Sequence, residues 1–340
     1  MPPSHYDLLE VHPQASIEVI DAAYRALVKK HHPDVKNTLT ASVFKALTDA
    51  KDVLSDPVKR ATYDADRLNL GGKVIGGRWR IESPIAEGGF GKTYKGTHVL
   101  TGSPVCIKHC SRISPTDAAI LVDEARAMWD LRHFAVPAVR DLLKLDDGSL
   151  ALVQSFVPGP TLQEVVEAYA RRGEKLPPEH VAWMTSRILN ALSYIHRHGV
   201  IHGDLKPQNI VAQADEHSLS LVDFGLAAVK PKTTDGSKGY TDLFSPPEQV
   251  DGKPLLPQAD YYSLGMTMLH ALCGGDRGAV EGRRVPSTTP DALCKFVLRL
   301  LVRDPLGRPD YAKEDLFTTF EGVRQQAFGR AASGMLPLKM

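Results

Sequence analysis

The sequence predicts an α+β protein with more than one domain, in which a small helical unit precedes a larger body that begins with strands and continues with helices. The first seventy residues contain two amphipathic helical patterns, and residues 70–77 are rich in glycine, as in a flexible linker. Beyond the linker, short strand-like apolar runs give way to apolar positions spaced three or four apart. We therefore predict domains at 1–69 and 78–322, a linker at 70–77 and a tail at 323–340.

The N-terminal unit is predicted to hold two antiparallel helices that bury their apolar faces against each other. The first spans residues 16–31, where Ser16 can cap the helix and Pro33 ends it, because proline lacks an amide proton. The second spans residues 41–54 and stops at Ser55-Asp56-Pro57. The apolar faces consist of Ile17, Ile20, Tyr24 and Leu27 in the first helix and Phe44, Leu47, Ala50 and Leu54 in the second.

Between these helices lies the tripeptide His32-Pro33-Asp34, which taken alone would be a loop with a helix stop. With Y-D-L-L at residues 6–9, L-S-D-P at 54–57 and K-R-A-T-Y-D at 59–64, residues 5–67 resemble a J domain, the module by which Hsp40-type co-chaperones engage Hsp70. The resemblance implies that the tripeptide and a basic helix face bind an acidic surface on Hsp70. That face consists of Arg25, Lys29 and Lys30, which could otherwise be only a solvated face. No glycine/phenylalanine-rich segment or cysteine-rich zinc module follows, so the unit is interpreted as a docking module.

The larger body begins with a glycine cluster and a lysine at an apolar strand. Residues 85–94 read I-A-E-G-G-F-G-K-T-Y, and glycines allow backbone amides to approach phosphates closely, although such a cluster can also be a hairpin turn. Residues 105–108 read V-C-I-K, and a lysine at the end of an apolar strand needs a charged partner if it is buried. We expect Glu124 to be that partner, on a helix whose register continues through Met128, Leu131 and His133. Alternatively, Glu124 is a solvated helix residue like its neighbours Asp123 and Arg126.

Two later motifs carry the most specific chemistry. Residues 202–209 read H-G-D-L-K-P-Q-N, and residues 223–225 read D-F-G after an apolar run. A carboxylate, an ammonium group and an amide thus share one loop, and a second carboxylate follows a strand. Phosphoryl transfer from Mg-ATP needs this set: a base for the hydroxyl nucleophile, a cation for the charge of the phosphoryl group, and oxygen ligands for magnesium.

These motifs and their order resemble eukaryotic-type protein kinases over residues 78–320. The resemblance implies a bilobal fold with a β-rich N-lobe and a helical C-lobe. It also implies Asp204 as catalytic base and Lys206 as stabiliser of phosphoryl charge, a lysine position typical of Ser/Thr kinases. Asn209 and Asp223 would be the Mg²⁺ ligands, and Lys108, paired with Glu124, would hold the phosphates of ATP.

The resemblance further implies a nucleotide pocket and several structural anchors. Adenine would bond the backbone of the hinge between the lobes, near Ser155 and Val157. The family's glycine pattern is G-x-G-x-x-G, and Ala86 stands at its first glycine. The remaining nucleotide-binding candidates are Ile85, Gly88, Gly89, Phe90, Gly91, Thr93, Cys106, Lys108 and Val211. The anchors are Asp260 and Gly265 in a buried helix, Thr241 against the catalytic loop, and a buried pair of Glu248 with Arg308.

Composition excludes several other classes of protein. A net charge of +1 gives no electrostatic reason to expect nucleic acid or an anionic membrane as a partner. The sequence has no apolar run of about 18 residues and no signal-peptide pattern at its start, so a cytoplasmic location is expected. The four cysteines, Cys106, Cys110, Cys273 and Cys294, have no zinc-site spacing and fit a reducing compartment.

The sequence therefore predicts a serine/threonine protein kinase with an N-terminal J domain that recruits and stimulates an Hsp70. An alternative is a pseudokinase scaffold acting mainly as an Hsp70 adaptor, which Ala86 favours; a third is regulation of Hsp70 by tethering alone. Many kinases place an arginine before the catalytic aspartate, where it pairs with a phosphate on the activation segment, here residues 223–248. Gly203 occupies that position, so we predict activity without phosphorylation at Thr233, Thr234 or Ser237, although Lys230, Lys232 or Lys238 could offer a phosphate a weaker partner.

Overall fold

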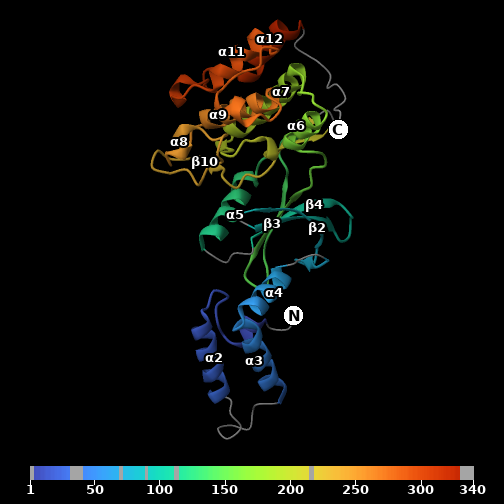
Figure 1. Cartoon of the computed structure of the whole chain (residues 1–340), viewed down its shortest axis with the longest axis vertical. Coiled ribbons are helices and arrows are strands. Elements are labelled where there is room, and N and C mark those ends of the chain that lie inside the picture. The colour runs from blue at the N-terminus through green and yellow to red at the C-terminus, as the bar shows by residue number, and fades with distance from the viewer. Residues whose placement is uncertain are drawn as a thin grey trace. The chain divides into compact units, whose positions relative to one another are not determined.

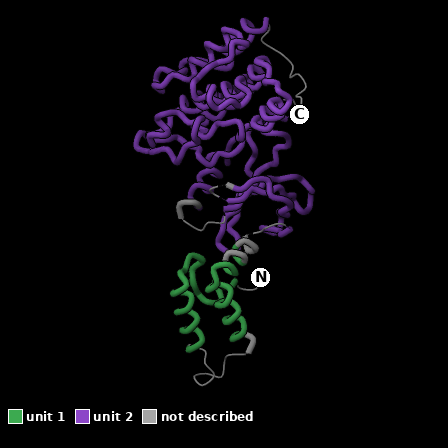
Figure 2. The backbone as a smooth tube through the Cα atoms, in the orientation of Figure 1, with its two compact units in different colours: residues 1–71 green, residues 72–340 purple. Residues whose placement is uncertain are grey.

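The computed structural model describes residues 4–30, 41–68, 72–88, 91–110, 115–213 and 218–329. The chain divides into two compact units, residues 1–71 and 72–340, which Figure 2 colours separately. His32, Pro33, Asp34, Gly89 and Phe90 lie outside the described residues, as does the side chain of Lys30.

The N-terminal unit is helical, as predicted. It contains α1 (His5–Leu8), α2 (Ile17–Lys30), α3 (Ala41–Leu54) and α4 (Pro57–Leu68), with α2 and α3 side by side in Figure 1. Its core contains Tyr6, Leu9, Ile20, Leu27, Leu47, Ala50 and Leu54. Two predicted core residues are wrong: Phe44 is 47% exposed and Ile17 is 39% exposed, because each lies in the first turn of its helix, beyond the contact between the two.

The Y-D pair at residues 63–64 connects the last helix of this unit to the first. The Tyr6 hydroxyl donates to Asp64 Oδ1 at 2.8 Å and accepts from Arg60 Nε at 3.1 Å. The Tyr63 hydroxyl accepts from the His5 backbone N–H at 2.9 Å. Since Tyr6 is buried, its polar hydroxyl needs partners, and α4 supplies both.

The strand-rich lobe of the larger unit is one antiparallel sheet. Among the described residues the strand order is β1-β2-β3-β4-β6-β5. Val74 and Ile75, which we assigned to the linker, form strand β1: Ile75 is buried, and Gly76 and Gly77 adopt positive φ to turn the chain into β2. The strands are β1 (Val74–Ile75), β2 (Trp79–Gly88), β3 (Gly91–His98), β4 (Pro104–Cys110), β5 (Val139–Lys144) and β6 (Leu150–Ser155).

Helix α5 (Pro115–Met128) packs on this sheet, with Leu121 and Ala125 in one apolar cluster with Cys110 and Leu152. It ends at Met128, so the predicted continuation through Leu131 and His133 is wrong. Leu131 is buried, but it lies in the connection toward β5, so its side chain packs in the core although the residue is not helical.

The second lobe is mostly helical, and its core surrounds α7 and α9. Every residue of α9 is buried, and Gly265 allows a close approach, since a Cβ there would lie 2.8 Å from Leu301. Helix α12 continues past residue 322, our predicted domain end, because Val323 and Phe328 pack on the same core.

The helices are α6 (Leu162–Arg171), α7 (Pro178–Arg197), α8 (Pro247–Val250), α9 (Gln258–Leu272), α10 (Arg277–Glu281), α11 (Asp291–Leu300) and α12 (Leu316–Phe328), with 3₁₀ turns η1 (Pro207–Asn209) and η2 (Pro305–Gly307). The short strands are β7 (Val200–Ile201), β8 (Ile210–Gln213), β9 (Ser218–Leu221) and β10 (Ala228–Val229).

The predicted Glu248–Arg308 pair is confirmed, and it is buried. The guanidinium binds the carboxylate through two bonds, 2.5 Å from Nη1 to Oε1 and 2.9 Å from Nη2 to Oε2. Arg308 also donates to the backbone carbonyls of Val302, Arg303 and Gln258. With its donors satisfied, the arginine connects α8, the start of α9 and the loop around η2.

Removing one member of this pair should destabilise the larger unit strongly. We expect Arg308→Ala to lower the free energy of unfolding by about 3–5 kcal/mol, because Glu248 is left buried and unpaired. Arg299→Ala is the matched control: it removes a more exposed arginine paired with Glu314 and should cost about 1 kcal/mol or less. Urea unfolding followed by tryptophan fluorescence measures both, because Trp79, Trp129 and Trp183 all lie in the larger unit. Equal losses in the two variants would contradict this account.

Candidate active site

The loop that carries Asp204 is fixed by a buried carboxylate. Asp260, near the start of α9, accepts the backbone N–H groups of His202 and Gly203, both at 2.9 Å. Its Oδ2 also lies 2.7 Å from His196 Nε2. Burial opposes its charge, but the bonds from His196 and the backbone hold the pKa of Asp260 below its usual value. The loop therefore has a fixed start at the end of β7.

Asp204 itself is bonded on both carboxylate oxygens. Thr241 Oγ1 donates to Oδ1 at 2.6 Å, while Lys206 Nζ and Asn209 Nδ2 donate to Oδ2 at 2.7 and 3.0 Å. Lys206 Nζ also donates to Thr241 at 3.0 Å, so the expected contact of Thr241 with this loop is confirmed. The carboxylate is ordered in one orientation by three donors, as a positioned base requires.

A second cluster centres on Lys108. Its ammonium nitrogen lies 2.6 Å from Glu124 Oε2 and 2.7 Å from Asp223 Oδ1, which joins β4, α5 and the segment after β9. The predicted Lys108–Glu124 pair is confirmed. Burial opposes the charge of Lys108, but the two carboxylates raise its pKa above the usual value. Lys108 lies within β4 instead of at its end, since the strand continues through Cys110.

The backbone around Asp223 is adapted to this cluster. Asp223 adopts a left-handed φ of 63°, and a Cβ at Gly225 would lie 3.2 Å from Asp223 Oδ1 and 3.3 Å from Lys108 Nζ. The protein around Asp223 partly desolvates this half-exposed carboxylate, which opposes its ionisation, but Lys108, with smaller contributions from His202 and Lys206, lowers its pKa. The catalytic loop and the Lys108 cluster are therefore within electrostatic reach of each other.

The oxygens of Asn209 and Asp223 fit a magnesium ion held together with phosphates. Both bonds of Asn209 use its Nδ2, so neither occupies its carbonyl oxygen, and the Asp223 side chain is 44% exposed. In the part of the chain that the structure describes, no group of three or more His, Cys, Asp or Glu side chains could hold a metal. One or two protein oxygens completed by substrate phosphates are the usual magnesium arrangement.

The described residues of the glycine-rich segment lie at the paired ends of β2 and β3. Ile85, Ala86 and Gly88 lie on β2, with Ala86 opposite Thr93 and Gly88 opposite Gly91. Gly91 has a φ of 141°, and a Cβ there would lie 2.0 Å from the carbonyl oxygen of His109. Glycine is therefore required at Gly91 by contact with the neighbouring strand.

The remaining pocket candidates lie on β4, on β8 and at the hinge. Burial raises the pKa of Cys106 to about 12, so this side chain is a neutral thiol. Val211 on β8 is buried. The Ser155 N–H donates to Ala138 at 2.9 Å, so of that residue's backbone only the carbonyl could bond adenine. Val157 follows two residues later and is partly exposed.

The sequence analysis missed the connecting contacts of two residues, Gln249 and Lys238. Gln249 Nε2 donates to the carbonyls of Gly203 at 2.7 Å and Gly239 at 2.8 Å, and so ties the activation segment to the catalytic loop. Lys238, on the same segment, pairs with Asp123 of α5 at 3.1 Å. Sequence spacing gives no signal for the contacts with Gly203 and Asp123, because both partners are far away along the chain.

This bilobal fold and its two polar clusters define a protein kinase domain, and comparison with known proteins agrees. The family model described as "Protein kinase domain" matches residues 79–279, more than half of the chain, and the chain belongs to this family. The model described as "DnaJ domain" matches residues 4–64, so the N-terminal unit is a J domain.

Similar proteins include serine/threonine-protein kinase pkn3 of Myxococcus xanthus, 28% identical over 273 residues, which are 71% of this chain and 49% of that protein. Serine/threonine-protein kinase PknL of Mycobacterium tuberculosis is 32% identical over 59% of this chain and 50% of its own length. Maternal embryonic leucine zipper kinase of Danio rerio is 34% identical over 58% of this chain and 29% of its own. The chain thus spans about half, or less, of the length of these relatives.

Within the described residues, no helix is both long and apolar enough to cross a membrane.

Proposed function

We propose that this chain is an active serine/threonine protein kinase that uses Mg-ATP, and that its J domain recruits and stimulates an Hsp70. In this proposal residues 1–69 are the J domain and the kinase domain begins at residue 78. Two clusters of side chains support the proposed kinase activity. In one, three donors hold Asp204, and in the other, Lys108 lies between Glu124 and Asp223.

Each side chain has a role that its contacts support. Asp204 would accept the proton of a protein hydroxyl, because Thr241, Lys206 and Asn209 orient its carboxylate. Lys206 carries a positive charge beside that base, where negative charge on the transferred phosphoryl group needs compensation. Bound Mg-ATP would supply the phosphoryl group and the metal charge, with Asn209 and Asp223 as metal ligands.

The nucleotide would be held by residues from both lobes. Lys108, fixed by Glu124, would contact the phosphates. The glycine-rich segment, with Ile85, Ala86, Gly88, Gly89, Phe90 and Gly91, would cover them. Thr93, Cys106 and Val211 would line the adenine pocket, and the backbone of Ser155 and Val157 would bond the base.

The alternative is a pseudokinase scaffold that serves mainly as an Hsp70 adaptor. Ala86, in place of the family's first glycine, is the observation that favours it. Against it, a scaffold has no need to keep the partly buried Lys108 between two carboxylates, since desolvating charges costs free energy. Phosphate transfer by the purified chain separates the two.

Removing the base should nearly abolish phosphate transfer. We expect Asp204→Asn to slow transfer to Ser/Thr substrates by about 10²–10⁴-fold, and Asp223→Ala to be at least as severe. Asp251→Asn, which changes a 55% exposed aspartate of the same unit, should leave the rate unchanged. The measurement is Mg-dependent labelling from γ-phosphate-labelled ATP, with the labelled residues identified by mass spectrometry. If the Asp204 and Asp223 variants label substrate as fast as the parent, the assigned roles are wrong.

The Hsp70 proposal rests on the J domain and on exposed charge. Arg25 and Lys29 are exposed on α2 one turn apart, in the arrangement expected for binding an acidic partner. His32, Pro33 and Asp34 follow α2 in the sequence, outside the described residues. The partner would be an Hsp70-type chaperone, and the expected cytoplasmic location is consistent with that partner.

We expect the chain to accelerate ATP hydrolysis by a cognate Hsp70, and His32→Gln to abolish the acceleration. The substitution changes the tripeptide between α2 and α3 and leaves the buried residues of the unit intact. His12→Gln, the same change elsewhere in the unit, is the control, and Asp204→Asn should stimulate as well as the parent. Single-turnover Hsp70 hydrolysis measures the effect, and circular dichroism checks the fold. A folded parent that accelerates no cognate Hsp70 refutes this part of the proposal.

Activity should not require phosphorylation of the activation segment. Gly203 has a φ of 74°, and a Cβ there would lie 2.6 Å from the carbonyl oxygen of Leu226, so no side chain is available to bind a phosphate. Thr233 and Thr234 are exposed, and the Ser237 hydroxyl donates to the Gln249 carbonyl at 2.8 Å.

We therefore expect the triple variant Thr233→Ala, Thr234→Ala, Ser237→Ala to keep activity within about threefold of the parent. Thr241 is left unchanged, because it bonds Asp204. Kinase assays on both proteins, after phosphatase treatment of the parent, measure the effect. Loss of activity that acidic residues at the same three positions restore would show that a phosphate is needed.

A further inference from the structure

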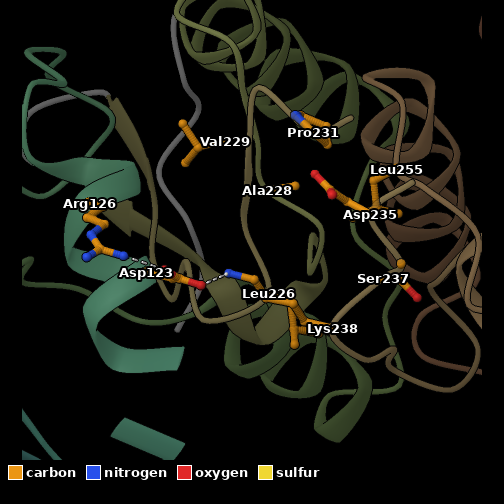
Figure 3. A pocket seen from close by; sticks show the side chains of 11 residues that line it. Asp123, Arg126, Leu226, Ala228, Val229, Pro231, Asp235, Ser237, Lys238 and Leu255 are labelled. Atoms are coloured by element: carbon orange, nitrogen blue, oxygen red, sulfur yellow. Dashed lines mark hydrogen bonds and ion pairs between the residues drawn. The ribbon is translucent and has the colours of Figure 1, made fainter. Parts of the chain in front are cut away.

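Helix α5 and the activation segment border a pocket of about 360 Å³, seen in Figure 3. Its lining includes neither Lys108 nor Asp204, so it is distinct from the two clusters of the candidate active site. Lys238 Nζ lies 3.1 Å from Asp123 Oδ2, and Arg126 Nη1 lies 3.2 Å from the other oxygen of Asp123. Figure 3 shows Asp123 between these two basic side chains.

Asp123 is the residue immediately before Glu124. Consecutive helical residues project about 100° apart, so one turn of α5 presents Glu124 to Lys108 and Asp123 to the activation segment. Because both side chains share one stretch of helical backbone, a force that holds Asp123 also holds Glu124. The contact thus acts on the Lys108–Glu124 pair without touching the nucleotide.

Apart from the Lys108–Glu124 pair, the contacts that fix α5 come from apolar residues elsewhere on the helix. Leu121 and Ala125 pack against the sheet, and Ala127 and Met128 belong to the core of the helical lobe. Toward the activation segment there is the pocket, whose apolar lining includes Leu226, Val229 and Leu255. Near Asp123 the segment is therefore connected to α5 by charge across an open space instead of by close apolar packing.

We propose that Lys238 is a positioning residue for phosphoryl transfer: its ion pair with Asp123 holds α5 where Glu124 meets Lys108. The inference rests on the proposed kinase function and explains how the segment can be ordered without a phosphate. Both side chains are partly exposed, 29% for Lys238 and 40% for Asp123, so the effect should be about two- to fivefold and sensitive to salt.

The test is a double-mutant cycle of Lys238→Gln, Asp123→Asn and the double variant in the full chain. Each single variant should raise the KM for ATP about two- to fivefold. The double variant should be no worse than either single one, because both remove the same interaction. In about 0.5 M NaCl the parent should approach the variants, since salt screens a partly exposed pair.

Two controls separate this role from a general effect of charge or of folding. Lys232→Gln removes the same charge from the same segment but leaves the Asp123 pair intact, so its KM for ATP should equal that of the parent. Hydrogen exchange of the α5 amides, measured without nucleotide, should be faster in Lys238→Gln and Asp123→Asn than in the parent and in Lys232→Gln.

An unchanged KM for ATP, or additive effects in the cycle, would overturn the inference while the parent remains an active kinase. A parent that transfers no phosphate would instead overturn the proposed function. In that case hydrogen exchange still decides whether the ion pair holds α5, since that measurement needs no activity.

Discussion

The ammonium group of Lys108 is the point on which the geometry of the kinase domain depends. It is bonded at once to Glu124 on α5 and to Asp223 after β9, and so connects the sheet and the helix beside it to the activation segment of the second lobe. A charge in this place is tolerated because two carboxylates surround it. Glycine at position 225 leaves room for this ion pair, since a side chain there would crowd both Lys108 and Asp223.

The second lobe uses buried charges to fix loops that have little regular structure. Asp260 binds two backbone N–H groups at the start of the catalytic loop. Arg308 binds Glu248, at the end of the activation segment, and also three backbone carbonyls outside that segment. Between these fixed ends, Gln249 and Thr241 bond the catalytic loop directly. The activation segment is thus ordered by neutral and ionic hydrogen bonds among residues of the chain itself.

This order is the physical reason to expect a kinase that is active without phosphorylation. A phosphate on an activation segment orders it by supplying strong acceptors for an arginine. Here the position of that arginine is Gly203, whose backbone conformation and neighbour, Leu226, leave no room for a side chain. The bond from Gln249 and the ion pair from Lys238 to Asp123 provide connections of a different kind.

The sequence by itself determined the two domains, the helical pattern of the first and the chemistry of the second. Local motifs sufficed for this, because their spacing along the chain reflects a single loop or helix, as at residues 202–209. Even the Lys108–Glu124 pair could be predicted, because a lysine on an apolar strand needs a carboxylate and the resemblance to protein kinases indicated which one. Only the tertiary structure decided that Phe44 faces solvent and that α5 ends at Met128. It also decided two long-range contacts: Asp223, 115 residues from Lys108, binds that lysine, and Lys238 binds Asp123. These contacts join segments brought together by packing of the whole lobe, and no local periodicity or spacing encodes such a distance.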